Sequence, residues 1–260
     1  MKIIVCIKQT FDTEAKIALD VSGQVISQGI KEIMNPYDEF AVEEAVRLKE
    51  SLGAEVTIIS LGDDSTVNTI RQALAMGADQ AVLLNDSTFQ NGDEYTTAKA
   101  LAKAIGEMEY DLILAGWTAI DDGSAQVASR VAELLDIPQI TIVTNLTIEN
   151  NNAVAHREIE GGQEIIEASL PVMITTQKGL NEPRYPALKQ IMKAKKKEIK
   201  KVGCLDLGLN PSEFGTEGSL IEIESIFLPP KRQNGKILEG EPQEIVLDLV
   251  KSLKEEAKVL

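Results

Sequence analysis

Short β-branched runs alternate with helical patterns through the first two thirds of the chain, and this alternation limits the fold more than any other feature. We predict strands over residues 2–9, 54–62, 80–85, 111–117 and 140–146. Strands that alternate with helices form a parallel sheet with helices on both faces. The predicted fold class is therefore α/β, with a doubly wound, mostly parallel, Rossmann-like sheet.

Four helices are expected between these strands. The first has the clearest boundary signals, with Asn35 as the N-cap, Pro36 at the first helical position and Gly53 as the closing residue. The other three are predicted from about Ser65 to near Gly77, over roughly 95–108 and over 122–135.

Two insertions and a long tail depart from this repeat. One hairpin is predicted around Ser22-Gly23, and another turns at the asparagines 150–152. After residue 176 the composition indicates an extended arm, ending in a helix with Ile245, Leu249 and Leu253 on one face. We therefore divide the chain into an α/β domain (1–180), a loop with a basic helix (181–201), and a C-terminal arm with its helix (202–260).

Composition excludes several classes of protein. The formal net charge of -15 argues against a nucleic-acid binder, because such proteins need a basic face. Cys6 and Cys204 lie far apart in the chain and support neither a disulfide framework nor a thiolate metal site. The apolar run "IIVCI" is too short for a signal peptide or a membrane span, so we expect a cytoplasmic protein without membrane insertion.

The familiar catalytic motifs are missing from the sequence. It contains no G-x-G-x-x-G after a strand, no Walker A loop and no H-E-x-x-H, and its single histidine, His156, is interpreted as an ordinary strand residue. The pairs Asp63-Asp64 and Asp121-Asp122 each follow a strand and precede a helix, where helix capping is the simplest interpretation. No catalytic side chain is assigned, and whether the chain is itself an enzyme stays open.

The ends of the predicted strands offer a nucleotide site. In an open parallel sheet, ligands lie at the carboxyl ends of strands, where helix N-termini present free N–H groups to anions. We expect the amides of Ser124, Ala125, Gln126 and Val127 to form the first turn of the fourth helix and to approach a phosphate. The aspartates 121 and 122 either cap this helix or meet ribose hydroxyls, because a carboxylate repels a phosphate.

One concentrated basic block stands out in this acidic chain. The segment "LNEPRYPALKQIMKAKKKEIKK" (180–201) carries six lysines in its last nine positions, directly after a Pro-Arg-Tyr-Pro turn. An exposed Leu188 between Pro186 and a basic helix is typical of a transient protein interface, with an apolar anchor and a charged rim. The simpler alternative is a solvated helix face.

Several stretches together resemble the β subunits of electron transfer flavoproteins. The match covers nearly the whole chain in order, and it rests on "MNPYDEFAVEEAVRLKE" (34–50), "LAMGAD" (74–79), "AIDD" (119–122), "AHREIEGGQEIIEASLPVMIT" (155–175) and "NEPRYPALKQIMKAKKK" (181–197). The resemblance implies an α subunit as partner, across which the C-terminal arm reaches. It also implies that Leu188 anchors a recognition loop on a flavin-dependent dehydrogenase, with the lysines steering an acidic surface.

The same resemblance assigns the nucleotide contacts. They are Cys6, Asn35, Asp38, Ser60, Leu61, Gly116, Asp122, Ala125, Gln126 and Val127, to which the strand-end argument adds Ser124. Family members that hold a structural AMP usually read Asn-Gln-Thr where this chain has Ala125-Gln126-Val127, and "SAQV" is more similar to electron-bifurcating members, which bind a second FAD there.

Three functions follow as alternatives. The bifurcating type accepts a hydride from NADH on this FAD and sends one electron to ferredoxin and the other toward the α subunit and the dehydrogenase, so that the flavin performs the chemistry. A conventional electron transfer flavoprotein would hold AMP here instead. An alternative of another class is a stand-alone nucleotide-binding hydrolase or stress-type protein, for which the long arm has no use.

Overall fold

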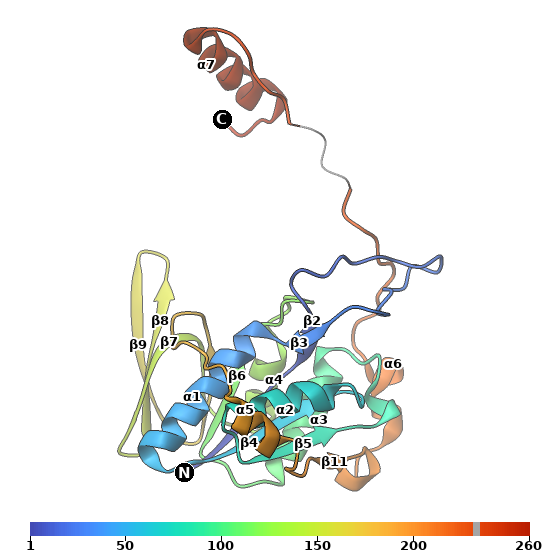
Figure 1. Ribbon diagram of the computed structural model, residues 1–260, viewed down its shortest axis with the longest axis vertical. Coiled ribbons are helices and arrows are strands. Elements are labelled where there is room, and N and C mark those ends of the chain that lie inside the picture. The colour runs from blue at the N-terminus through green and yellow to red at the C-terminus, as the bar shows by residue number, and fades with distance from the viewer. Residues whose placement is uncertain (231–234) are drawn as a thin grey trace. The chain divides into compact units, whose positions relative to one another are not determined.

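The computed structural model describes residues 1–230 and 235–260, which form two compact units (Figure 1). The larger unit contains residues 1–17 and 26–224, and the smaller one contains residues 18–25 and 225–260. The α/β architecture predicted from the sequence belongs to the larger unit and is confirmed there.

A nine-stranded sheet runs through the larger unit in the order β11-β5-β4-β1-β6-β10-β7-β8-β9. Its parallel part consists of β1 (Lys2–Cys6), β4 (Glu55–Leu61), β5 (Gln80–Leu84), β6 (Leu112–Gly116), β7 (Gln139–Glu149), β10 (Val172–Thr176) and β11 (Lys200–Val202). The sheet is extended by β8 (Asn152–Ile159), which pairs antiparallel with β7, and by β9 (Gly162–Ser169), which pairs antiparallel with β8. All five predicted strands are present, although the first is shorter than expected and is followed by a separate antiparallel pair, β2 (Gln9–Phe11) and β3 (Glu32–Met34).

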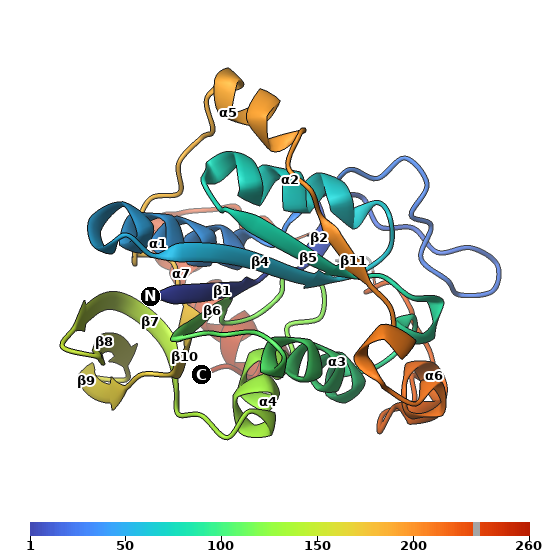
Figure 2. The same ribbon diagram turned by 90° about the horizontal axis from the view of Figure 1, so that it is seen from below.

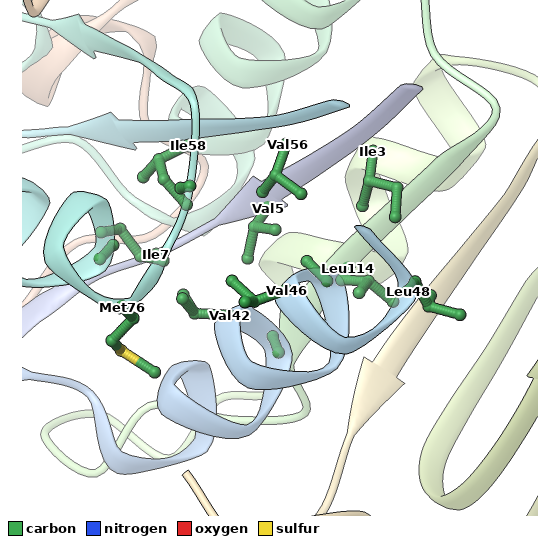
Figure 3. Packing of buried hydrophobic residues seen from close by; sticks show 14 of the residues in the cluster. Ile3, Val5, Ile7, Val42, Val46, Leu48, Val56, Ile58, Met76 and Leu114 are labelled. Atoms are coloured by element: carbon green, nitrogen blue, oxygen red, sulfur yellow. The ribbon is translucent and has the colours of Figure 1, made fainter. Parts of the chain in front are cut away.

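Helices cover both faces of this sheet, as the alternating pattern requires (Figure 2). The helices α1 (Pro36–Leu52) and α2 (Thr66–Met76) pack on one face, and α3 (Glu94–Gly106) and α4 (Val127–Leu134) pack on the other. Successive residues of β1 point to opposite faces: Ile3 and Val5 join the core under α1 (Figure 3), and Ile4 joins the core under α3. Two buried cores therefore fix the sheet from both sides.

The first helix has the predicted limits, but its N-cap works differently from the prediction. The helix begins at Pro36, and Gly53 ends it in the left-handed conformation, with φ 70° and its N–H donated to the Lys49 carbonyl. Asn35 is the N-cap residue by position, yet its side chain makes no capping hydrogen bond. That side chain donates instead to the Thr118 carbonyl, at 2.9 Å, and so connects α1 to the segment after β6.

The fourth helix begins at Val127, five residues later than the prediction of 122. Asp121 and Asp122 lie in turns before it and do not cap it. The expectation that Ser124, Ala125 and Gln126 form its first turn was therefore wrong, and these residues belong to a loop that leads into the helix.

The antiparallel extension contains one expected hairpin and one strand that the prediction missed. β7 and β8 are joined at Asn150 and Asn151, which adopt positive φ angles of 49° and 64°. β9 follows a second turn at Gly161, with φ 77°, and pairs with β8 along its whole length. The other predicted hairpin, around Ser22-Gly23, is reduced to an isolated bridge between Leu19 and Val25.

The lysine-rich segment is only partly helical. α5 (Leu188–Ala194) ends before most of the lysines, so the predicted basic helix stops at Ala194. Lys200 and Lys201 lie in β11, which extends the sheet beside β5.

The expected arm also begins later than residue 202. The short helices η2 (Leu205–Leu207), η3 (Pro211–Glu213) and α6 (Gly215–Gly218) follow β11 within the larger unit, and Cys204, Leu207 and Phe214 are buried in the core under α3. The larger unit therefore continues beyond residue 202, as far as Glu224.

The smaller unit contains the C-terminal helix that the apolar stripe predicted. α7 (Pro242–Lys251) begins with Pro242 in its first turn and continues as one π-helical turn over Ser252–Glu256. Ile245 and Leu253 of the predicted stripe are half-buried, while Val246 and Leu247 are more than half exposed. Within the described residues, no helix is both long enough and apolar enough to cross a membrane.

Candidate functional site

The strand order creates a crevice between β1 and β6. The chain passes from β1 through α1 to β4 on one side, and later returns to β6 on the other side of β1. In such sheets the ligand lies outside the carboxyl ends of the two strands where the order reverses. A cavity of ≈ 1050 Å³ opens at this place. It is lined by Cys6 at the end of β1, by Ile7 and Lys8 just after it, and by Ala115 and Gly116 of β6.

Asp38 ties the two strand ends to the start of α1. Its carboxylate accepts the Lys8 N–H at 2.7 Å, the Gly116 N–H at 3.0 Å and the Asn35 side-chain amide at 3.1 Å. Burial raises the pKa of Asp38 to about 7, against these donors, which favour its charged form. Asp38 therefore fixes the cavity floor by bonds that lie inside the fold.

Lys8 pairs with both aspartates of the 119–126 loop. Its Nζ lies 2.8 Å from a carboxylate oxygen of Asp121 and 2.8 Å from Oδ2 of Asp122. Burial acts to lower the pKa of Lys8, but the hydrogen bonds to the two carboxylates hold that pKa above its usual value. The second carboxylate oxygen of Asp122 accepts the Ser124 N–H at 2.9 Å. This trio brings the loop to the end of β1 and reduces the negative charge beside the cavity.

The residues just before α4 present free backbone donors to the cavity. Ala125, Gln126 and Val127 line it, and Ala125 adopts a positive φ of 55°. Within residues 1–230 and 235–260, no acceptor is found for the N–H groups of Ala125 and Gln126, and the first N–H of any helix lacks an intrahelical partner. Such a cluster of amides at a helix start is a binding site for an anion, above all a phosphate.

The structure brings together nearly all of the predicted nucleotide contacts. Cys6, Asn35, Asp38, Leu61, Gly116, Asp122, Ser124, Ala125, Gln126 and Val127 all line the cavity. Ser60 does not, because its hydroxyl is buried and donates to the Ile7 carbonyl at 2.8 Å. Burial raises the pKa of the Cys6 thiol to about 12, so this cysteine stays protonated at neutral pH.

Two parts of the cavity wall were not predicted from the sequence. The loop after β5 contributes Asn91, Gly92 and Asp93, which the strand-end rule could have found. Residues 219–223 form the opposite part, and no sequence signal marked them. Asp93 joins the two, because it accepts the Leu220 N–H at 2.7 Å and donates its own N–H to the Ser219 hydroxyl at 3.0 Å.

These residues fit an adenine dinucleotide. The cavity volume of ≈ 1050 Å³ is slightly above the usual range for small-molecule sites, about 300–1,000 Å³. Free amides are available for the phosphates and carboxylates for ribose hydroxyls. Trp117, in contact with Tyr37 at a ring distance of 5.5 Å, holds a buried indole N–H without a partner among the described residues.

The predicted recognition residue lies outside this cavity, at the start of α5. Leu188 is 75% exposed and Tyr185 is 99% exposed, with the half-exposed Met192 on the same short helix. The segment therefore presents apolar side chains to solvent, which is unusual unless they bind a partner.

Comparisons with known proteins identify the family to which the chain belongs. A family model described as "Electron transfer flavoprotein domain" matches residues 22–205. "Electron transfer flavoprotein subunit beta" of Bacillus subtilis is 48% identical over 261 residues, covering 100% of each chain. The human protein of the same description is 38% identical over 264 residues, covering 100% of this chain and 99% of its own. "Caffeyl-CoA reductase-Etf complex subunit CarD" of Acetobacterium woodii is 38% identical over 258 residues, covering 98% of each chain. With a family model over most of its length and relatives aligned from end to end, the chain belongs to the electron transfer flavoprotein family, among the β subunits.

Proposed function

We propose that this chain is the nucleotide-binding subunit of a heterodimeric electron transfer flavoprotein, paired with an α subunit in the cytoplasm. The observation that carries the proposal is the cavity at the ends of β1 and β6, with unpartnered amides at Ala125 and Gln126 on its wall. Family membership sets aside the alternative of a stand-alone hydrolase or stress-type protein, because the relatives align over the full chain.

We further propose that the bound nucleotide is FAD. Its support is the loop sequence Ala125-Gln126-Val127, which resembles bifurcating members, together with a cavity large enough for a dinucleotide. When bound, the flavin would supply the redox chemistry, taking a hydride from NADH and releasing single electrons to ferredoxin and toward the α subunit and the dehydrogenase. The chain's own residues would bind and orient the nucleotide: the amides of Ala125 and Gln126 would bind its phosphates, and the ion pairs of Lys8 with Asp121 and Asp122 hold the 119–126 loop at the end of β1.

A conventional subunit with AMP is the second candidate. The same amides suit the phosphate of AMP. The two candidates differ in what occupies the rest of the cavity, between the loop and residues 219–223.

Nucleotide analysis of the purified αβ complex tests both proposals. We expect two FAD per heterodimer, measured by absorbance and by chromatography after denaturation. One FAD with one AMP would overturn bifurcation and favour the conventional type. A complex with one FAD and no second nucleotide would overturn the assignment of the cavity.

We also propose that the exposed segment around Leu188 docks on the partner dehydrogenase, and that α7 and residues 225–230 bind the α subunit. The support is apolar exposure: Leu188, Phe227 and Leu247 are each at least 70% exposed. Unchanged electron transfer to the native dehydrogenase by Leu188→Ala would remove the first of these assignments.

A further inference from the structure

The segment that carries Leu188 is fastened at both of its ends. We call residues 181–194 the docking segment. At its start, the Asn181 side-chain amide donates to the Phe40 carbonyl at 3.0 Å and to the Glu44 carboxylate at 2.9 Å. At its end, Ala194 is buried, and its carbonyl accepts a hydrogen bond from Arg71 of α2 at 2.5 Å.

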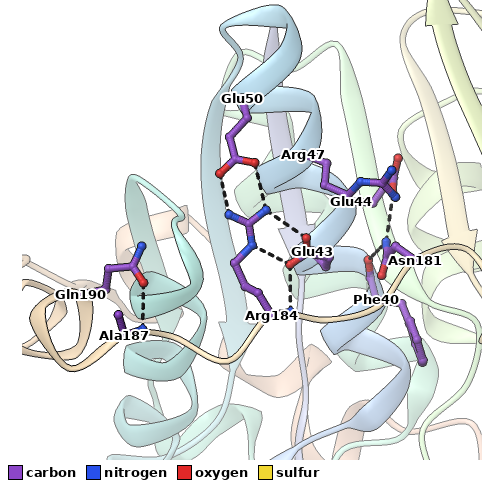
Figure 4. Close-up of polar contacts among 9 residues, drawn as sticks. All are labelled: Phe40, Glu43, Glu44, Arg47, Glu50, Asn181, Arg184, Ala187 and Gln190. Atoms are coloured by element: carbon purple, nitrogen blue, oxygen red, sulfur yellow. Dashed lines mark hydrogen bonds and ion pairs between the residues drawn. The ribbon is translucent and has the colours of Figure 1, made fainter.

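Arg184 is a third fastening, and it has the largest number of bonds (Figure 4). Its guanidinium donates twice to Glu43, at 2.8 and 2.9 Å, and twice to Glu50, at 2.5 and 3.0 Å. Its backbone N–H also donates to Glu43, at 3.1 Å. Paired bonds from one guanidinium to a carboxylate fix orientation as well as distance.

One of the two acceptors, Glu43, is buried. The side chain of Glu43 is only 6% exposed, and that of Arg184 is 28% exposed, so removal of Arg184 leaves a buried carboxylate without its cation. Hydrogen bonding to Glu50 and Glu43 raises the pKa of Arg184, which therefore stays charged at every pH at which the protein is folded.

Between these fastenings the chain has little support of its own. Tyr185 and Leu188 face solvent, and Pro183 and Pro186 restrict the backbone without contributing an N–H to the fold. Leu188 lies four residues after Arg184, so the direction in which the chain leaves α1 determines where this leucine is presented.

We infer that Arg184 is a positioning residue for partner docking: its bonds to Glu43 and Glu50 hold the docking segment on α1 in the conformation that presents Leu188 to the dehydrogenase. The inference rests on the docking role proposed for Leu188. A segment ordered before binding loses less conformational entropy on binding, so its affinity is higher without any additional contact to the partner.

The test uses the αβ complex and its native dehydrogenase, with steady-state transfer kinetics. In Arg184→Gln we expect the KM for the dehydrogenase to rise about threefold to tenfold, as for one or two side chains that must be ordered on binding. The limiting rate and the nucleotide content stay unchanged. Arg184→Lys keeps the charge but cannot bridge both carboxylates, and we expect an intermediate KM.

Arg47→Gln provides the matched control. Arg47 lies on α1, is exposed and pairs with Glu44 at 3.4 Å, so this variant removes one positive charge beside α1 and leaves the bonds of Arg184 to Glu43 and Glu50 intact. Its KM should equal that of the wild type. A rise as large as that of Arg184→Gln would attribute the effect to long-range charge and overturn the inference.

A double variant separates positioning from direct contact. If Arg184 acts through Leu188, then Arg184→Gln adds nothing to KM in a Leu188→Ala background. Equal effects of Arg184→Gln in both backgrounds, or no effect of either Arg184 variant while Leu188→Ala raises KM, would overturn the positioning role alone. If Leu188→Ala leaves KM unchanged, the proposed docking role fails, and this inference fails with it.

Discussion

The cavity and the docking segment lie on the same domain but differ in the chemical groups that form them. The cavity is formed by backbone amides and by buried polar groups such as Asp38, whose partners all lie within the fold. The docking segment presents exposed apolar side chains, and only its ends are fastened. A site with internal bonds is rigid before its ligand arrives, which suits a resident nucleotide. A site with exposed side chains suits a partner that must bind and leave.

This contrast predicts that variants of one region leave the other unaffected, and that buried and exposed charges respond to pH in opposite directions.

The pH dependence of stability should show the burial of Asp38. Its pKa is raised in the folded state, so the stability it contributes is fully present below its unfolded pKa and is lost as the pH rises through about 7. The unfolding free energy of the wild type relative to Asp38→Asn should therefore fall between about pH 4 and 7, by up to about 1.4 kcal/mol per pH unit. Urea unfolding of the purified protein at a series of pH values measures this slope.

Glu50→Gln is the matched control for Asp38→Asn, because Glu50 is the exposed carboxylate that accepts hydrogen bonds from Arg184 of the docking segment. The hydrogen bond from Arg184 lowers the pKa of Glu50, so its contribution is present above its unfolded pKa and is lost as the pH falls. The difference between wild type and Glu50→Gln should have the opposite sign of slope and a smaller size, because Glu50 is exposed. A slope of the same sign for both variants would break the comparison.

Gly116→Ala should damage the cavity and not the docking segment. A Cβ at this position would overlap Asp38 Oδ1 and lie 2.7 Å from Tyr37 Cβ, so the floor of the cavity must shift. We expect a loss of about 1–3 kcal/mol in stability, together with a reduced nucleotide content of the αβ complex. Gly162→Ala, where no atom lies within 4 Å of the new Cβ, should behave as the wild type.

Lys8→Met should weaken nucleotide binding by a smaller amount. The substitution leaves Asp121 and Asp122 without their cation beside the proposed phosphate site, at a cost of about 1 kcal/mol because Lys8 is half exposed. Titration of nucleotide-depleted complex should show the dissociation constant rising severalfold. Lys8→Met combined with Asp122→Asn should recover part of the loss, and a double variant weaker than the single one would contradict this role for Lys8.

The smallest effect is expected from the exposed lysines after α5. Lys195→Gln with Lys196→Gln should slow association with the dehydrogenase by a few fold at low salt, and the difference should vanish in about 0.5 M salt as charges are screened. Stopped-flow mixing measures this rate, with Lys103→Gln on α3 as the control for net charge. A difference that persists at high salt would assign the lysines to direct contact.

Features that depend on neighbouring residues were predictable from the sequence, and those that depend on distant ones were not. α1 was predicted with its limits because Pro36 and Gly53 act locally. α4 was predicted too early because Asp121 and Asp122 resemble a helix cap, whereas in the structure they pair with Lys8, which lies 113 and 114 residues earlier in the chain.

The same distinction explains which residues of the cavity could be predicted from the sequence. The predicted contacts lie at strand ends that a parallel sheet brings together, so strand order alone collects them. The wall at residues 219–223 depends on Asp93, more than 120 residues away, and β11 is a strand only because β5 offers it a free edge. A lysine-rich segment has no intrinsic preference for a strand, so its own residues could not have indicated β11.

Helix α1 contributes to both the cavity and the support of the docking segment. Its first residues adjoin the cavity, and Glu43, Glu44 and Glu50 further along the same rod receive the docking segment. A substitution that reshapes this helix is therefore expected to change both the proposed nucleotide site and the presentation of Leu188 to the proposed dehydrogenase partner. We expect sequence differences among relatives to occur mainly in the exposed side chains that follow Arg184, and to be fewer in α1.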